Sequence, residues 1–177
     1  MRRAFHIVPG SAAGRGFLIG LSAFLLAVSA VEAYLGFTLP PSGQAGRVSL
    51  LLGALVVFCV AGLVLYTAGS MRNVQFLVSA DALRVVGDLF GRTIPRSVLR
   101  AGEGRLVSLE GAYRPVWKTC GTGSPGYLAG WFRLANREKA LLFVTDATRI
   151  VYLPTTQGYS VLLSVAEPEE FLRALRG

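Results

Sequence analysis

Two long apolar stretches dominate the first seventy residues of the chain. Between Gly16 and Leu39 there is no Lys or Arg and only one acidic residue, and Val48 to Gly69 carries no charge. A membrane helix needs about 20 apolar residues. We therefore expect spans at about 16–39 and 48–69. The Pro- and Gly-rich run 40–47 cannot continue a helix, so residues 1–70 are predicted to form a transmembrane hairpin.

A cleaved signal peptide is the alternative interpretation of the first stretch. Its positive region would be Arg2, Arg3 and Arg15, and its cleavage site Val28–Ala30. The apolar run continues to Leu39, which is longer than a signal peptide requires. We favour an uncleaved helix, whereas cleavage would leave a single span.

From Met71 onward the apolar runs become short and alternate with polar positions. Each run has four to seven residues, is rich in β-branched and aromatic side chains, and is bounded by turn residues, as is typical of strands. The runs are Val74–Val78, Leu83–Val86, Leu89–Ile94, Arg105–Leu109, Trp131–Leu134, Ala140–Thr145, Arg149–Leu153 and Tyr159–Leu163. This spacing predicts an antiparallel sandwich or barrel.

The last ten residues predict a short amphipathic helix. Pro168 and its acidic neighbours suit a first helical turn, and Phe171, Leu172 and Leu175 share one face. The predicted fold is therefore two transmembrane helices followed, in residues 71–177, by a mainly-β barrel of about seven antiparallel strands with a capping C-terminal helix.

The region from about Phe76 to Leu175 resembles the bacterial pleckstrin-homology-like (PH-like) domain family. The residues that carry the resemblance are Ile94-Pro95, Gly121–Tyr127 with Gly130, Val144-Thr145, Val151–Leu153, Thr156, Leu163-Ser164, Glu167-Pro168 and Phe171-Leu172. The resemblance implies the PH-like barrel and association with a membrane, and it implies no particular chemistry.

Composition and charge agree with a membrane location. Of the 177 residues, 53% are hydrophobic and 16% charged, whereas soluble domains carry about 25% charged residues; such hydrophobicity excludes disorder. The N-terminal arginines and Arg72 outweigh the single Arg47 of the connection, and positive residues favour the cytoplasmic side. We expect a multi-pass protein of the bacterial inner membrane with both termini cytoplasmic, where Cys120 stays reduced.

No set of residues predicts catalysis, a metal or a cofactor. His6 is the only histidine and precedes the first span, Cys59 lies inside the second span, and Cys120 is isolated. A nucleophilic pair or a metal site needs such groups to converge. We therefore expect no enzyme.

The stretch Gly121–Gly126 is predicted to be a structural loop. It lacks the Lys of a phosphate-binding loop and leads to a strand rather than a helix. With the aromatic residues around it, it is a candidate partner-binding loop, and the alternative is packing at the barrel mouth. The candidate residues are Tyr113, Trp117, Gly123 and Tyr127.

The net charge of +8 suggests an anionic partner. The basic residues that could face anionic lipid are Arg72, Arg84, Arg92, Arg96 and Arg100. Nucleic acid is not expected, because it needs clustered basic residues with stacking aromatics. The turn 79–82 has no basic residue, which argues against specific recognition of inositol phosphates.

Two features of the spans each have two interpretations. Glu32 is either a functional intramembrane carboxylate or a side chain that reaches the interface beside Tyr34. Gly16 and Gly20 form a GxxxG that Ala23 and Ala27 continue, which favours close helix packing, within the hairpin in the first instance and between protomers as the alternative.

Three functions follow from this pattern. The leading hypothesis is a non-enzymatic, membrane-anchored binding module for a protein partner. The alternatives are an anionic-lipid-binding, membrane-organising domain and, through Glu32, an accessory subunit of a membrane transport complex.

Overall fold

The computed structural model describes residues 3–38 and 44–177. The chain divides into two compact units. One is Arg15–Gly69, and the other joins the chain up to Gly14 with Ser70–Gly177. Of the predicted connection at 40–47, residues 40–43 lie outside the described residues, and residues 44–47 begin α2, so the prediction that they are not helical is wrong.

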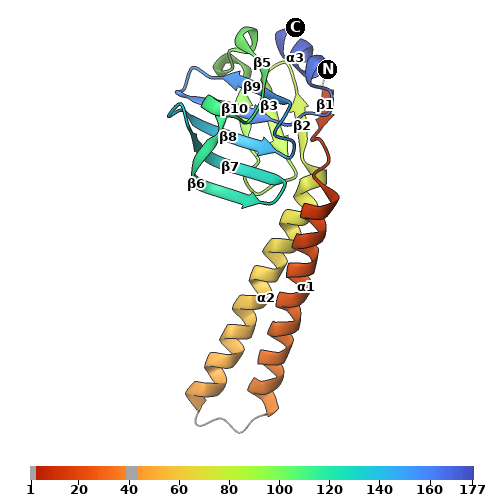
Figure 1. The fold of residues 1–177 in the computed structure, drawn as a ribbon, viewed down its shortest axis with the longest axis vertical. Coiled ribbons are helices and arrows are strands. Elements are labelled where there is room, and N and C mark those ends of the chain that lie inside the picture. The colour runs from red at the N-terminus through yellow and green to blue at the C-terminus, as the bar shows by residue number, and fades with distance from the viewer. Residues whose placement is uncertain (1–2, 39–43) are drawn as a thin grey trace. The chain divides into compact units, whose positions relative to one another are not determined.

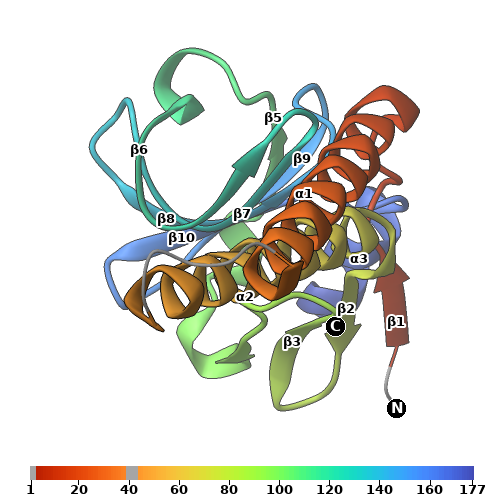
Figure 2. The ribbon, with the colours of Figure 1, turned by 90° about the horizontal axis from the view of Figure 1, so that it is seen from below.

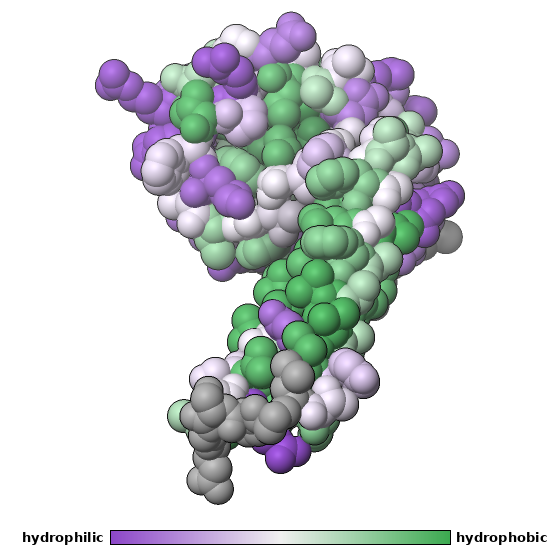
Figure 3. Space-filling model, turned by 60° about the horizontal axis from the view of Figure 1, so that its bottom comes forward, coloured by the Kyte–Doolittle hydropathy of each residue, from purple (hydrophilic) through white to green (hydrophobic). Residues whose placement is uncertain are grey.

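The first unit is a pair of long helices, α1 (Ala12–Thr38) and α2 (Gln44–Asn73), which also extend into the second unit. Both are long and apolar enough to cross a membrane by length and composition. Their surface is largely hydrophobic (Figure 3). Small side chains form the seam between them: Ala54 and Ala61, seven residues apart, are buried.

Two serines of α1 tie the helices together. The Ser22 hydroxyl donates to the carbonyl of Ala61 at 2.9 Å, and the Ser29 hydroxyl donates to the carbonyl of Ala54 at 2.8 Å. Such bonds contribute roughly 0.6 kcal/mol each in a membrane. The GxxxG motif lies outside the seam between the two helices, because a Cβ at Gly16 or Gly20 would meet nothing within 4 Å. The expectation that this motif packs within the hairpin is therefore wrong.

The second unit contains two sheets and a helix (Figure 1). The four-stranded sheet has the order β1 (Arg3–His6), β2 (Gln75–Val78), β3 (Ala82–Val86), β4 (Thr93–Pro95). The six-stranded sheet has the order β5 (Arg105–Val107), β9 (Ile150–Pro154), β10 (Tyr159–Leu163), β8 (Lys139–Val144), β7 (Tyr127–Leu134), β6 (Pro115–Ser124). Short 3-10 turns, η1 (Arg96–Val98), η2 (Ala101–Glu103) and η3 (Gly111–Tyr113), link β4, β5 and β6.

The predicted fold class is confirmed, with more strands than the seven expected. The pairing is mostly antiparallel, and β8 and β10 run parallel. The additional strands are β1, which precedes the first long helix, and β6, which contains the glycine-rich stretch. The prediction that 121–126 is a loop is therefore wrong.

Helix α3 (Pro168–Arg176) packs against the strands as the sequence predicts. Phe171 is fully buried, and its ring centre lies 5.2 Å from that of Phe5 on β1 and 6.2 Å from that of Phe76 on β2. The six-stranded sheet is curved (Figure 2). A second apolar cluster on its strands includes Phe132, Leu142 and Leu162.

Strand β1 joins the chain before α1 to the chain after α2. Phe5 pairs with Phe76 in an antiparallel register, and the Ile7 amide donates to the carbonyl of Val74 at 3.1 Å. The two long helices are thus inserted between the first and second strands of one sheet.

Candidate partner-binding surface

The candidate surface is built on the hairpin of β6 and β7. The strands are joined by Pro125 and Gly126, and Gly126 has φ +74°. A proline followed by a residue with positive φ suits the two central positions of a tight turn.

The glycines within this hairpin allow the two strands to approach closely. Gly130 has φ +107° and pairs with Gly121. A Cβ added at Gly130 would lie 2.6 Å from the Gly121 Cα, closer than any real side chain tolerates. These glycines therefore shape paired strands, which explains why a stretch of turn-type residues is not a loop.

Strand β6 is the outer strand of its sheet, and among the described residues it pairs only with β7. The exposed fractions of Val116 and Trp117 are 53% and 71%. Register shifts between Pro115 and Trp117 and between Lys118 and Cys120 interrupt the ladder. Bulges of this kind change the direction of side chains. Beyond Cys120 the pairing is regular up to the turn.

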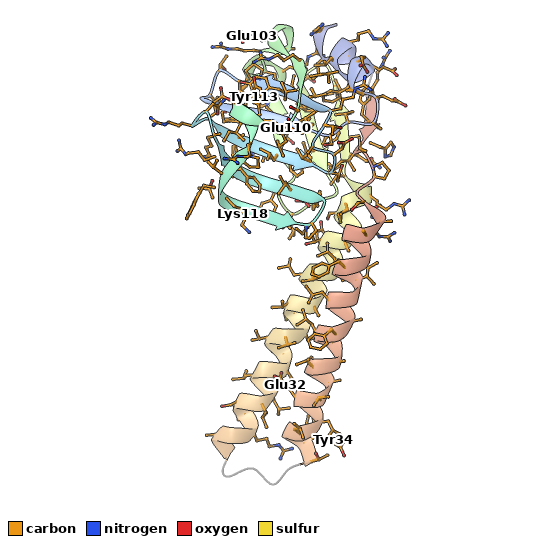
Figure 4. The ribbon with its side chains drawn as sticks, viewed as in Figure 1. Glu32, Tyr34, Glu103, Glu110, Tyr113 and Lys118 are labelled. Carbon is orange, nitrogen blue, oxygen red and sulfur yellow. The ribbon has the colours of Figure 1, made fainter. Side chains whose placement is uncertain are left out.

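The segment of chain that contains β6 and β7 carries charge of one sign. From Gly111 to Arg137 the chain has no acidic residue, and its basic residues are Arg114, Lys118, Arg133 and Arg137. Figure 4 shows Lys118 on β6 and Tyr113 on the segment that leads to it. A surface of this charge attracts anionic groups.

The four residues predicted for a partner-binding loop have different environments. Trp117 and Gly123 are exposed on β6, and Tyr113 is half-buried in η3. Tyr127 is buried, and its hydroxyl donates to Asp88 Oδ2 at 2.7 Å. The structure thus places Trp117 and Gly123 on the same exposed strand and Tyr127 in the interior.

A polar cluster that the sequence did not indicate lies beside η3. Arg105 donates to the Tyr113 hydroxyl at 2.7 Å and stacks 4.7 Å from the ring centre of Tyr152. The Tyr152 hydroxyl donates to Glu138 at 3.1 Å. Burial and, next, the Glu138 carboxylate raise the pKa of Tyr152 to about 12. The bond to Tyr113 raises the pKa of Arg105.

The five arginines predicted to face lipid are spread over several elements. Arg72 is in the last turn of α2 and Arg84 is on β3, both exposed. Arg92 stacks 5.3 Å from the ring centre of Trp131, and Arg100 pairs with Glu103 at 3.4 Å. Arg96 donates to the carbonyls of Ser79 and Leu175. Three of the five therefore have partners within the domain.

Glu32 belongs to α1 (Figure 4). Its Oε2 atom is buried and has no hydrogen-bond partner among the described residues. A Cβ at Gly53 of α2 would lie 3.6 Å from this atom, so the carboxylate faces the seam of the hairpin. Tyr34 is 66% exposed on the same helix.

Within residues 3–38 and 44–177 there is no group of three or more His, Cys, Asp or Glu side chains that could hold a metal ion. His6 lies on β1, and both Cys59 and Cys120 are exposed free thiols.

These features define a class of protein: a curved β-sheet domain closed by a C-terminal helix and joined to two apolar helices. Residues 105–177, which include the six-stranded sheet and α3, match the family model of the bacterial PH domain. Domains of this family are generally non-catalytic binding modules. Comparison with curated proteins gives no match, and comparison with solved structures gives none.

Proposed function

We propose that this protein is a non-enzymatic, membrane-anchored module that presents its PH domain to a protein partner at the cytoplasmic face of the bacterial inner membrane. The observation that carries this proposal is the exposed strand β6. It combines the more exposed of the two tryptophans, Trp117, with the basic Lys118 and no acidic residue. Exposed tryptophans are enriched in the energetic centres of protein interfaces.

The pairing of β1 with β2 supports two spans with both ends on one side. If α1 and α2 span the membrane, the pairing of β1 with β2 keeps the start of α1 and the end of α2 on the same side, which is consistent with two crossings. Cleavage after Ala30 would remove β1 and uncover Phe76 and Phe171, which Phe5 helps to bury. The bias of arginines toward the domain side favours the cytoplasm.

Anchoring gives the binding surface a functional advantage. A domain confined to a membrane meets membrane-bound partners at a raised effective concentration. A modest intrinsic affinity of the β6 surface is then sufficient.

A site-specific photocrosslinker tests the proposal in the full-length protein in its membrane. We expect a crosslinker at Trp117 to capture a discrete protein, and the matched control at Leu89, 59% exposed near the other sheet, to capture none. Lys118→Glu in the Trp117 crosslinker protein should abolish the capture. Crosslinking of lipid alone from Trp117 would contradict protein binding and favour the membrane-organising alternative.

A further inference from the structure

Strand β6 has an open edge that is available for pairing with another strand. The structure has four edge strands, and three of them are short: β1 has 4 residues, β4 has 3 and β5 has 3. Strand β6 has 10. Natural proteins commonly keep exposed edge strands short because an open edge accepts another strand. Strand β6 is thus the one long edge in the described structure.

The regular part of this edge lies between the second bulge and the turn. From Cys120 to Ser124 each residue pairs in unbroken register with β7. In an antiparallel ladder, alternate residues direct their N–H and C=O groups away from the neighbouring strand. This five-residue stretch therefore offers a row of backbone donors and acceptors on its open side.

The side chains of this stretch leave the edge accessible. Its residues are Cys120, Gly121, Thr122, Gly123 and Ser124. A Cβ at Gly123 would meet only the Leu128 side chain, at 3.7 Å. This part of β6 presents no bulky side chain to an incoming strand. Trp117 and Lys118 lie nearer the other end of β6.

The basic charge of this surface favours an acidic segment over a second copy of the chain as the strand that pairs with β6. A second copy of the chain pairing edge to edge would use the same patch on both molecules, and this patch has no acidic residue to attract Lys118 and the other basic residues. Like charges across a pairing are unfavourable. An acidic segment gains the opposite interaction with the basic residues listed above for Gly111–Arg137.

We propose that Cys120–Ser124 binds an extended acidic segment of a partner protein as an additional strand. The backbone of β6 supplies affinity, and Lys118 and the neighbouring arginines select acidic side chains, as in other strand-addition complexes. This inference rests on the proposed function and specifies the partner and the mode of binding at the same surface.

Hydrogen exchange of the full-length protein in nanodiscs of zwitterionic lipid tests the inference. The probe is a ten-residue peptide of alternating valine and glutamate. We expect those amides of Cys120–Ser124 that face the open edge to exchange at least about fivefold more slowly when the probe is bound, since a ladder bond protects an amide from exchange. Lys118→Glu should weaken binding several-fold, and added salt should do the same.

Two matched probes distinguish the mode of binding. A valine–lysine peptide should not bind. The valine–glutamate peptide with all of its backbone amides N-methylated keeps its charge and loses its donors on both edges, so it should bind at least about fivefold more weakly. Equal binding of the N-methylated peptide, or unchanged exchange at Cys120–Ser124, would overturn strand addition. Protection of these amides by anionic vesicles and not by the acidic peptide would also overturn it.

The proposed function can fail separately. If Trp117 crosslinks a protein and exchange at β6 is unchanged by that protein and by the peptide, the binding module stands and the strand-addition mode is wrong. If Trp117 captures no protein, the proposed function fails as well.

Discussion

Gly130 occupies a backbone conformation that other residues rarely adopt, at φ +107° against Gly121. We predict that Gly130→Ala lowers the free energy of unfolding of the domain by more than about 2 kcal/mol, because a strained backbone costs about 1–3 kcal/mol and the new Cβ also meets β6. Chemical denaturation followed by circular dichroism measures the loss.

The matched control for this substitution is Gly158→Ala. Gly158 also has positive φ, at +74°, but a Cβ there would meet nothing within 4 Å. We expect a loss of only about 1 kcal/mol. Equal losses for the two variants would show that the close approach of β6 and β7 does not limit position 130.

The strand conformation of the glycine-rich stretch could not be predicted from its own residues. Gly121 looks like a turn residue in the sequence, but glycine is needed there because Gly121 approaches Gly130 on β7, which pairs with β6 only once the chain has folded. Of the predicted loop 121–126, only Pro125 and Gly126 form a turn. The exposure of Trp117 and the burial of Tyr127 likewise depend on which side of the hairpin each side chain takes.

Tyr152 should titrate well above an ordinary tyrosine. Its pKa of about 12 results from burial and the Glu138 carboxylate. The folded state keeps this proton where the unfolded state, with a pKa of 10.0, loses it. The stabilising contribution is thus fully present below pH 10 and is lost as the pH rises toward 12.

Ultraviolet absorbance of the phenolate measures this titration. We predict that Tyr152→Phe removes a component with a midpoint near 12 and leaves the transition near pH 10 unchanged. Loss of a component near pH 10 instead would contradict the environment described for Tyr152.

At the scale of elements, α3 packs against the four-stranded sheet through Phe171. Its ring contacts Phe5 and Phe76 in the four-stranded sheet. We predict that Phe171→Ala lowers the free energy of unfolding by about 3–5 kcal/mol, the typical loss for a fully buried phenylalanine. The exposed Arg173→Ala on the same helix should change it by less than about 0.5 kcal/mol.

Thermal and chemical denaturation of both variants measure this difference. A loss below about 1 kcal/mol for Phe171→Ala would mean that the helix does not close the domain.

The elements differ in how well the sequence indicated them. The long helices, α3 and most strands were predictable because each has a clear hydrophobic period. Strand β1 was not, because it has 4 residues with one buried side chain, Phe5, too few to show an alternation. Its strand character depends on pairing with β2, some seventy residues away in the sequence.

At the scale of the whole molecule, α1 and α2 are inserted in the sequence between β1 and β2, so the second compact unit is formed by chain segments from both sides of the helix pair. The sequence indicated two spans and a C-terminal domain, and it placed the whole N-terminal segment with the spans. Which strands lie at the edges, and therefore where a partner can add, depends on long-range pairing that no local pattern records.

Cysteine accessibility in intact cells tests this topology most directly. In a background with Cys59→Ala and Cys120→Ser, single cysteines are placed by Ala4→Cys on β1 and by Ala45→Cys near the start of α2, both at exposed positions. A third protein keeps the exposed Cys120 of the domain. A membrane-impermeant maleimide is added before and after permeabilisation.

We predict that Ala45→Cys reacts in intact cells, and that Ala4→Cys and Cys120 react only after permeabilisation. Reaction of Ala4→Cys and Cys120 from opposite sides of the membrane would contradict the pairing of β1 with β2 and, with it, the anchored domain described here.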